Sequence, residues 1–209
     1  MTVNNNFSDI AYNRKSIRLY DESVKISNEE MLEMIQKSTI APSSVNMQPW
    51  RFVVVESPEE KQKLKPLIRF NTRQNDTSSA MILIFGDMEC YEYGEEIYNQ
   101  AVIEGKMSPQ VRDEQLAAII PYYKNLSREK MNDVVKIDSS LAAMQFMLVA
   151  RAHGYDTNPI GGFEADELAE AFGLKKDRYV PVMILSIGKA LEEGYDSIRL
   201  DAKEFITFK

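Results

Sequence analysis

The sequence predicts one α+β domain, in which separate strands alternate with helices in an order too irregular for a doubly wound sheet. Two continuous apolar runs, 80–86 and 180–188, have the composition of buried strands. A third, valine-rich run at 52–55 is a shorter strand. With 209 residues, 44% of them hydrophobic, the chain can bury about 70% of its unfolded surface in one core. It contains no repeat or low-complexity linker, so we expect residues 1–209 to form a single domain.

Capping residues mark the helices of the first half. We expect a brief helix over 7–12, followed by a basic segment. Ser27 and Glu30 form a capping box for the next helix, which ends before Pro42. The apolar stripe of that helix consists of Met31, Met34, Ile35 and Ile40. Ser57 and Pro58 have the residue types of an N-cap and a first helical position, so a third helix follows the 52–55 strand.

The second half is predicted to be mainly helical. Residues 89–128 are charged and tyrosine-rich without a strand pattern, which indicates a helical excursion from the domain. A long helix over 134–153 ends at Gly154, because glycine accepts the left-handed conformation of a helix C-terminus. A further helix over 164–172 is stopped by Gly173.

Composition excludes several classes of protein. A net charge of −7 and a pI near 5.0 argue against nucleic acid or an anionic membrane as the main partner. Cys90 is the only cysteine, which excludes an intrachain disulfide framework and a cysteine-rich metal site. The first six residues are polar and no apolar run approaches about 18 residues, so we expect a cytoplasmic protein that is neither secreted nor membrane-spanning.

Two polar segments are candidates for ligand binding. Prolines stiffen the loop 41–52, and its hydroxyls and amides suit a planar polar ring. These side chains belong to Ser43, Ser44, Asn46 and Gln48. The segment 14–18 carries three cations and a hydroxyl, which alternate sides if it is extended, so that one face can serve one ligand. The simpler alternative for this segment is a solvated basic stretch.

Five segments, taken in order, resemble the nitroreductase family from about Tyr12 to the C-terminus. They are Arg14-Lys15-Ser16-Ile17-Arg18, the loop 42–50, Phe70-Asn71-Thr72-Arg73-Gln74, Asn158-Pro159-Ile160-Gly161-Gly162-Phe163 and Ile198-Arg199-Leu200. The resemblance implies a nitroreductase-like fold with a central, mainly antiparallel sheet flanked by helices. It also implies a homodimer with one FMN at each of two sites shared between the subunits.

The resemblance assigns the flavin contacts to two groups of residues. In one subunit, Arg14, Ser16 and Arg199 would hold the phosphate, and Lys15 or Lys189 would replace a cation that some members carry where this chain has Ser197. Arg18 would lie at the pyrimidine edge and stabilise the reduced flavin. Asn71 and Gln74 would contact the pyrimidine, and Pro159, Ile160, Gly161 and Gly162 would bring a backbone N–H to N5. From the partner subunit would come Pro42, Ser43, Ser44 and Asn46.

Each assignment has a structural alternative. Asn71 and Gln74 also suit a polar helix end before a buried strand, and the glycines suit an ordinary turn. Trp50 is expected to be a core or interface residue. His153 is expected to contact a helix C-terminus, and Cys90 lacks a neighbouring base or cation that would make it a nucleophile.

The implied function is an FMN-dependent oxidoreductase that passes hydride from NADH or NADPH through FMN to a nitroaromatic, quinone or similar acceptor by a ping-pong mechanism. The flavin carries the chemistry, so no catalytic side chain and no metal are assigned. One alternative is a flavin-binding protein for storage or sensing, without turnover. Another is a family branch with a different reaction, such as dehalogenation, enoate reduction or flavin breakdown.

Overall fold

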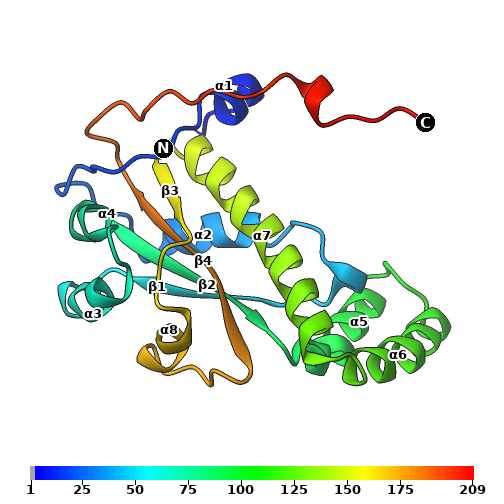
Figure 1. Cartoon of the computed structure of the whole chain (residues 1–209). Coiled ribbons are helices and arrows are strands. Elements are labelled where there is room, and N and C mark those ends of the chain that lie inside the picture. The colour runs from blue at the N-terminus through cyan, green and yellow to red at the C-terminus, as the bar shows by residue number, and fades with distance from the viewer. Residues whose placement is uncertain (1–2) are drawn as a thin grey trace.

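The computed structural model describes residues 3–209, so Met1 and Thr2 of the polar start lie outside it. A four-stranded sheet forms its centre, and every neighbouring pair of strands is antiparallel. The strands lie in the order β1 (Trp50–Val55), β2 (Ala80–Asp87), β4 (Tyr179–Gly188) and β3 (Asp156–Ile160) (Figure 1). The expected α+β fold with an antiparallel central sheet is confirmed.

Four helices precede β2, two of them before β1 and two between β1 and β2. They are α1 (Phe7–Tyr12), α2 (Asn28–Ser38), α3 (Pro58–Leu64) and α4 (Thr72–Thr77), with 3-10 turns η1 (Ser44–Asn46) and η2 (Lys65–Leu67). Ser27 caps α2 as expected, because its hydroxyl accepts from the Glu30 N–H at 3.2 Å. The Glu30 carboxylate accepts from the Tyr155 hydroxyl at 2.8 Å. Ile40 lies beyond the end of α2 and is 74% exposed, so its place in the buried stripe was wrong.

The second half contains η3 (Cys90–Tyr93), α5 (Gly94–Ile103), α6 (Pro109–Lys124), α7 (Arg128–Ala152), α8 (Ala165–Ala171) and η4 (Ala202–Glu204). The long helix α7 begins at Arg128 and not at Val134, because the Ser127 hydroxyl caps it by accepting from the Lys130 N–H at 3.3 Å. Strand β3 was not expected. It includes Pro159, which lacks an N–H and is tolerated because β3 lies at the edge of the sheet.

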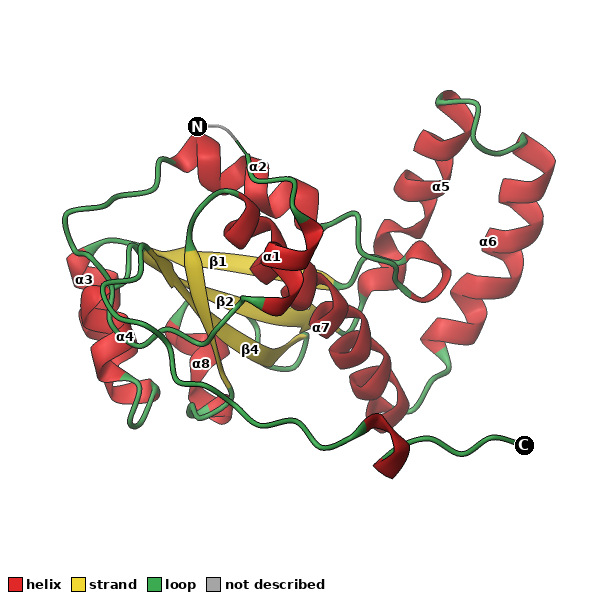
Figure 2. Ribbon diagram, turned by 90° about the horizontal axis from the view of Figure 1, so that it is seen from above, coloured by secondary structure: helices red, strands yellow, loops and turns green. Residues whose placement is uncertain are grey.

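Helices cover both faces of the sheet (Figure 2). On one face, α2 and α7 pack against Ile82 and Ile84 of β2. On the other, α3 and α8 pack against Leu83 and Phe85. This alternation follows from the two-residue period of a strand. No helix within residues 3–209 combines the length and apolar content of a membrane span.

Helices α5 and α6 project beyond one end of the sheet (Figures 1 and 2). With the first turns of α7 they enclose a separate cluster of buried side chains, which includes Met47, Cys90, Tyr98, Tyr123 and Val135. Met47 belongs to the polar loop before β1, so this loop packs on the projecting helices.

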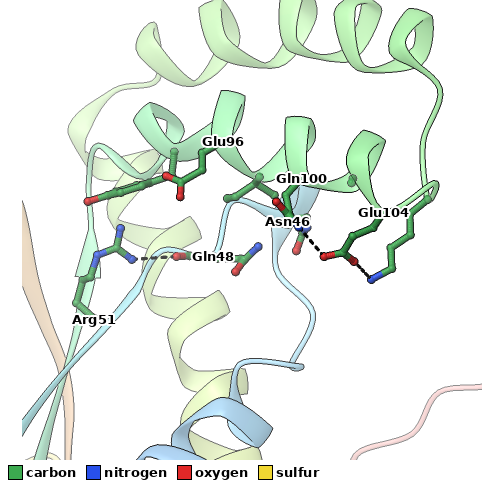
Figure 3. Close-up of a pocket in the computed structure, with 10 residues that line it drawn as sticks. Asn46, Gln48, Arg51, Glu96, Gln100 and Glu104 are labelled. Carbon is green, nitrogen blue, oxygen red and sulfur yellow. Dashed lines mark hydrogen bonds and ion pairs between the residues drawn. The ribbon is translucent and has the colours of Figure 1, made fainter.

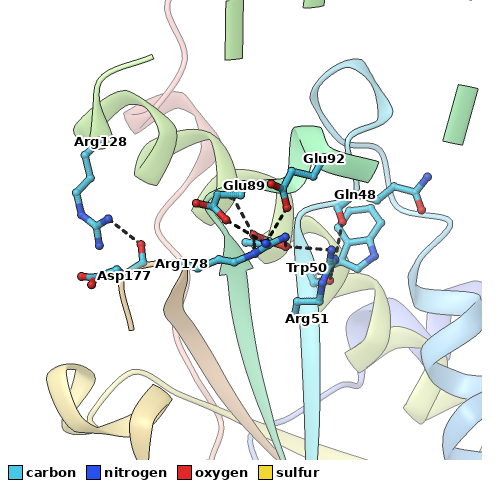
Figure 4. A network of polar contacts seen from close by, with 9 residues as sticks. Gln48, Trp50, Arg51, Glu89, Glu92, Arg128, Asp177 and Arg178 are labelled. Atoms are coloured by element: carbon cyan, nitrogen blue, oxygen red, sulfur yellow. Dashed lines mark hydrogen bonds and ion pairs between the residues drawn. The ribbon is translucent and has the colours of Figure 1, made fainter. Parts of the chain in front are cut away.

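Ion pairs around a buried carboxylate join the sheet to η3, the turn that leads into α5 (Figure 4). The Asp87 side chain, at the end of β2, is fully buried. Its two oxygens accept from Arg178 Nε at 2.8 Å and Nη2 at 3.0 Å, and from Arg51 Nη2 at 3.1 Å. Arg178 Nη1 also contacts Glu89 and Glu92, at 3.0 and 2.8 Å. The hydrogen bonds that Arg178 donates to Asp87 raise the pKa of Arg178, so this guanidinium stays charged.

Candidate functional site

The basic segment 14–18 runs extended beside the sheet edge. Ser16 forms a parallel bridge with Thr157 of β3, and the Ile17 N–H donates to the Thr157 carbonyl at 3.1 Å. Ile17 is buried, whereas the neighbouring Arg18 is exposed. Burial therefore changes between neighbouring residues here, as expected for an extended segment.

Arg14 and Arg199 form a pair of like charges at one end of this segment. Arg14 Nη1 is buried and has no hydrogen-bond partner among residues 3–209. Burial lowers the pKa of Arg14, and the charge of Arg199 lowers it further. A buried N–H without an acceptor and two neighbouring cations are both costly unless an anion lies between them. The donor set fits a phosphate, which guanidinium groups bind by charge-assisted hydrogen bonds.

The other cations near the pair already have partners. Lys15 Nζ lies 2.7 Å from Asp196 Oδ1, and Lys189 Nζ donates to the Gly154 carbonyl at 2.9 Å. The Arg18 guanidinium lies 5.0 Å from the centre of the Tyr195 ring. The chain after β4 therefore folds back over the basic segment. The expected place of Arg18 at a pyrimidine edge stays a prediction.

The start of α4 meets the end of β3. Asn71 Nδ2 donates to the Ile68 carbonyl at 3.0 Å and to the Gly162 carbonyl at 3.4 Å, and Asn71 Oδ1 accepts from Gln74 Nε2 at 3.2 Å. Gln74 is 4% exposed. Gly161 is exposed, and a Cβ built on it has no atom of residues 3–209 within 4 Å. Open space next to fixed amides is what a flat polar ring needs.

Pro159 and Ile160 can contribute only partly to such a site. Ile160 is 3% exposed, and its side chain packs in the core against α8 and β2. Only its backbone is available to a ligand. Pro159 is half-buried in β3 and has no N–H to donate. The available N–H groups of this segment therefore belong to the glycines that follow.

The loop from Pro42 to Asn46 lies apart from these residues. Ser44 contacts α7, and the carbonyls of Ser44 and Val45 accept from tyrosines of α6 and α5. In Figure 1 the loop adjoins the projecting helices, whereas α4 and β3 lie at the other end of the sheet. Pro42, Ser44 and Asn46 are exposed, and Ser43 is half-buried. One chain therefore brings together the first group of candidate residues and leaves this second group at a distance.

A polar cavity of about 720 Å³ opens beside the loop (Figure 3). Asn46, Gln48 and Arg51 line one side, and α5 lines the other with residues that include Glu96 and Gln100. The cavity does not include Arg14, Asn71 or the glycines after β3. It is therefore separate, within one chain, from the residues that fit a phosphate.

Thr157 and Asp138 were missed by the sequence reasoning. The Thr157 hydroxyl is buried without a partner in residues 3–209, opposite Ser16. It could have been found only by recognising β3. Asp138 is 3% exposed in the middle of α7. A single acidic residue in an apolar helical stripe was the available signal for it.

Trp50, His153 and Cys90, which were not assigned to the flavin site, have structural roles. Trp50 is 5% exposed and packs with Ala142 of α7. His153 is the C-cap of α7, as expected, and its Nδ1 lies 3.3 Å from Glu30 Oε1. Cys90 is fully buried, and burial raises the pKa of its thiol to about 12.

Comparison with known proteins identifies a family and several relatives of this chain. A family model described as "Nitroreductase family" matches residues 11–189. "Putative NAD(P)H nitroreductase YdgI" of Bacillus subtilis (strain 168) is 54% identical over 200 residues, which cover 96% of each chain. The "CLA biosynthesis enone reductase" of Lactiplantibacillus plantarum is 39% identical and covers 96% of this chain and 93% of its own.

Solved structures agree with the sequence relatives. A "putative nitroreductase in complex with FMN" from Exiguobacterium sibiricum 255-15 is 54% identical, has a TM-score of 0.96, and covers 99% of each chain. A "putative NAD(P)H:FMN oxidoreductase" from Staphylococcus epidermidis ATCC 12228 has a TM-score of 0.98 at 52% identity and covers 100% of this chain and 98% of its own. The chain therefore belongs to the nitroreductase family.

Proposed function

We propose that this protein is an FMN-dependent oxidoreductase that takes hydride from NADH or NADPH and reduces a small acceptor, such as a nitroaromatic or a quinone. One observation carries the proposal: the Arg14 N–H that has no partner within residues 3–209, beside Arg199, needs an anion of the kind that the FMN phosphate supplies. The flavin-bound relative at 54% identity supports the same ligand. The cytoplasm, which contains both donors, is the compartment that we propose.

The residues of this chain would bind and orient the cofactor. Arg14, Ser16 and Arg199 hold the phosphate. The amides of Asn71 and Gln74 present donors and acceptors to the pyrimidine, and the Gly161 backbone leaves the ring face open. Bound FMN would supply the chemistry by accepting hydride at N5 and passing two electrons to the acceptor. No side chain then needs to act as an acid or base.

We also propose that the active form is a homodimer. Pro42, Ser43, Ser44 and Asn46 are remote from the Arg14 group within one chain, so a second copy is needed for them to reach the same flavin. The exposed apolar side chains of the outer face of α7 provide a surface for that copy. They are Ile137, Leu141 and Met144, at helical spacing and 42% to 63% exposed.

A second candidate reaction is the reduction of an α,β-unsaturated ketone. The enone reductase relative, at 39% identity over 96% of this chain, favours it. Both reactions use the same flavin site, so the structure of that site is common to them.

The test is to purify the protein, record its flavin absorbance, and add NADH or NADPH without air. Bleaching of the flavin bands, followed by steady oxidation of the donor when a quinone, nitroaromatic or enone is added, is the expected result. Flavin that binds but never turns over would favour storage or sensing. A protein that stays colourless when FMN is supplied would refute the proposal.

A further inference from the structure

The loop before β1 has a backbone that most residues avoid. Val45, Asn46 and Gln48 have positive φ angles of 44°, 57° and 47°. Left-handed conformations cost about 1 kcal/mol or more for residues other than glycine, and a β-branched residue such as Val45 is a clear outlier. Contacts from elsewhere in the chain must therefore hold the loop in this form.

Asp138, a buried residue of α7, supplies two of these contacts. Its Oδ2 accepts from the Ser44 N–H at 2.9 Å, and its Oδ1 accepts from the Ser44 hydroxyl at 3.4 Å. Burial raises the pKa of Asp138, while the bonds from Ser44 lower it. Within residues 3–209 no cation contributes to that pKa. A buried carboxylate held mainly by neutral donors is costly, and here it contacts Ser44, an exposed residue of the loop.

The projecting helices hold the next residues of the same loop. The Tyr98 hydroxyl of α5 donates to the Val45 carbonyl at 3.0 Å, and the Tyr123 hydroxyl of α6 donates to the Ser44 carbonyl at 3.4 Å. Arg51 Nη1 donates to the Gln48 carbonyl at 3.2 Å. Donors from three elements and one buried acceptor thus fix three consecutive peptide groups, from Ser43–Ser44 to Val45–Asn46, and the carbonyl of Gln48. The side chains of Ser44, Val45 and Asn46 stay exposed.

We propose that Asp138 is a positioning residue that holds the loop Ser43–Gln48 in the strained conformation in which it completes the flavin site of the partner subunit. This inference rests on the proposed function. Tyr98 and Tyr123 assist by fixing the loop carbonyls. Asp138 touches neither flavin nor substrate, so its effect passes through the loop backbone to a site built on the other chain.

The first variant is Asp138→Leu, which has a similar size and removes both acceptor oxygens. We expect FMN binding to the dimer to weaken by about tenfold or more, which is what the loss of a hydrogen bond to a charged group costs. Asp138→Asn retains one acceptor oxygen, so its affinity for FMN should lie between those of the wild type and Asp138→Leu. Asp133→Asn, at an exposed position of the same helix, is the matched control and should bind FMN as the wild type does.

Mixed dimers then separate positioning of the partner's site from a general structural role. Subunits with Arg14→Ala and subunits with Asp138→Leu carry different tags, and the dimers that contain one of each are purified. If the loop serves the partner's flavin, one of the two sites contains neither change. That dimer should bind one FMN with wild-type affinity and show about half of the wild-type activity.

The other outcomes are distinct. A mixed dimer that binds no FMN, or a homodimeric Asp138→Leu that binds FMN normally, would overturn the proposal. If Asp138→Leu does not fold, Tyr98→Phe replaces it, with a smaller loss expected in the same direction and the same mixed-dimer test. Wild-type protein that binds no FMN at all would refute the proposed function instead.

Discussion

Arg14 shows how a binding residue can be unfavourable for the empty protein. Its pKa is lowered by burial and by Arg199, and one of its N–H groups lacks an acceptor among residues 3–209. We expect Arg14→Met to raise the melting temperature of the apoprotein and to weaken FMN binding by about ten- to hundredfold, because two charge-assisted bonds to a phosphate are lost.

Melting curves with and without FMN, together with a flavin titration, would measure both the gain in stability and the loss of FMN affinity. Arg112→Met is the control, because Arg112 pairs with Asp113 on the surface of α6, far from the pair. If Arg14→Met melts at a lower temperature without FMN and still binds it normally, Arg14 is a structural residue.

Lys61 predicts a dependence of stability on pH. Its amine is buried and donates to the Ser78 carbonyl, and burial lowers its pKa to about 8. In the unfolded chain a lysine has a pKa near 10.4. The unfolded state therefore holds more protons from about pH 8 to 10.5, so the free energy of unfolding rises with pH in that window.

Urea unfolding at pH 7 and pH 9 measures this effect. The wild type should gain up to about 1 kcal/mol relative to Lys61→Met over that interval. Other groups titrate equally in both proteins, so the difference isolates Lys61. Parallel curves for the two proteins would show that the amine is solvated.

Single residues were predicted correctly from the sequence where their own side chain or an adjacent residue determined their position. The burial of Trp50 and the C-cap position of His153 followed from side-chain size and from the glycine after the helix. Asp138 and Thr157 were missed because their importance comes from partners far away in the chain. Spacing along one element does not reveal such pairs.

At the scale of elements, the clamp formed by Asp87, Arg51 and Arg178 determines whether η3 and α5 stay attached to the sheet. It joins β1, β2 and the residue before β4. We expect Arg178→Met to destabilise the protein by about 3 to 5 kcal/mol, because it leaves the fully buried Asp87 with Arg51 as its remaining partner in this clamp.

Hydrogen exchange would show where the stability is lost, with the largest effect expected in α5 and α6. The double variant Asp87→Leu with Arg178→Met should recover part of the loss, because no unpaired charge stays buried. A loss spread evenly over the sheet, or no loss, would contradict the assigned role.

Most elements were predictable because local signals agreed. Serine caps, a proline after Ser57 and apolar runs marked α2, α3, β2 and β4. Strand β3 was not predicted because its five residues include Pro159 and lack an apolar run. It is stabilised by pairing with β4. An edge strand of this kind is defined by its neighbour more than by its own sequence.

For the whole molecule, sequence alone could not show that the candidate residues fall into two groups at different ends of the sheet. That separation results from the strand order β1-β2-β4-β3, which places the loop before β1 far from β3. Local patterns carry no information on strand order. The family resemblance supplied the expectation of a shared site, and the fold of one chain is compatible with it.

The C-terminal arm is where the proposed dimer can be tested without touching the flavin contacts. Beyond Arg199 it exposes Phe205 and Phe208, which are 74% and 93% accessible in the single chain. The arm extends away from the domain (Figures 1 and 2). Exposed aromatic side chains on an extended arm are costly in water, and burial against a second subunit would offset that cost by roughly 2 kcal/mol each.

We therefore expect the double variant Phe205→Ser, Phe208→Ser to raise the dimer dissociation constant by at least about a hundredfold, which corresponds to roughly 3 kcal/mol. Sedimentation over a range of concentrations measures this. FMN should be lost in parallel with dissociation and regained at high protein concentration, because Arg14 and Arg199 are intact and only the partner's loop is missing. A monomer that keeps its flavin would show that each chain forms a complete site, and an unchanged dimer would show that the arm lies outside the interface.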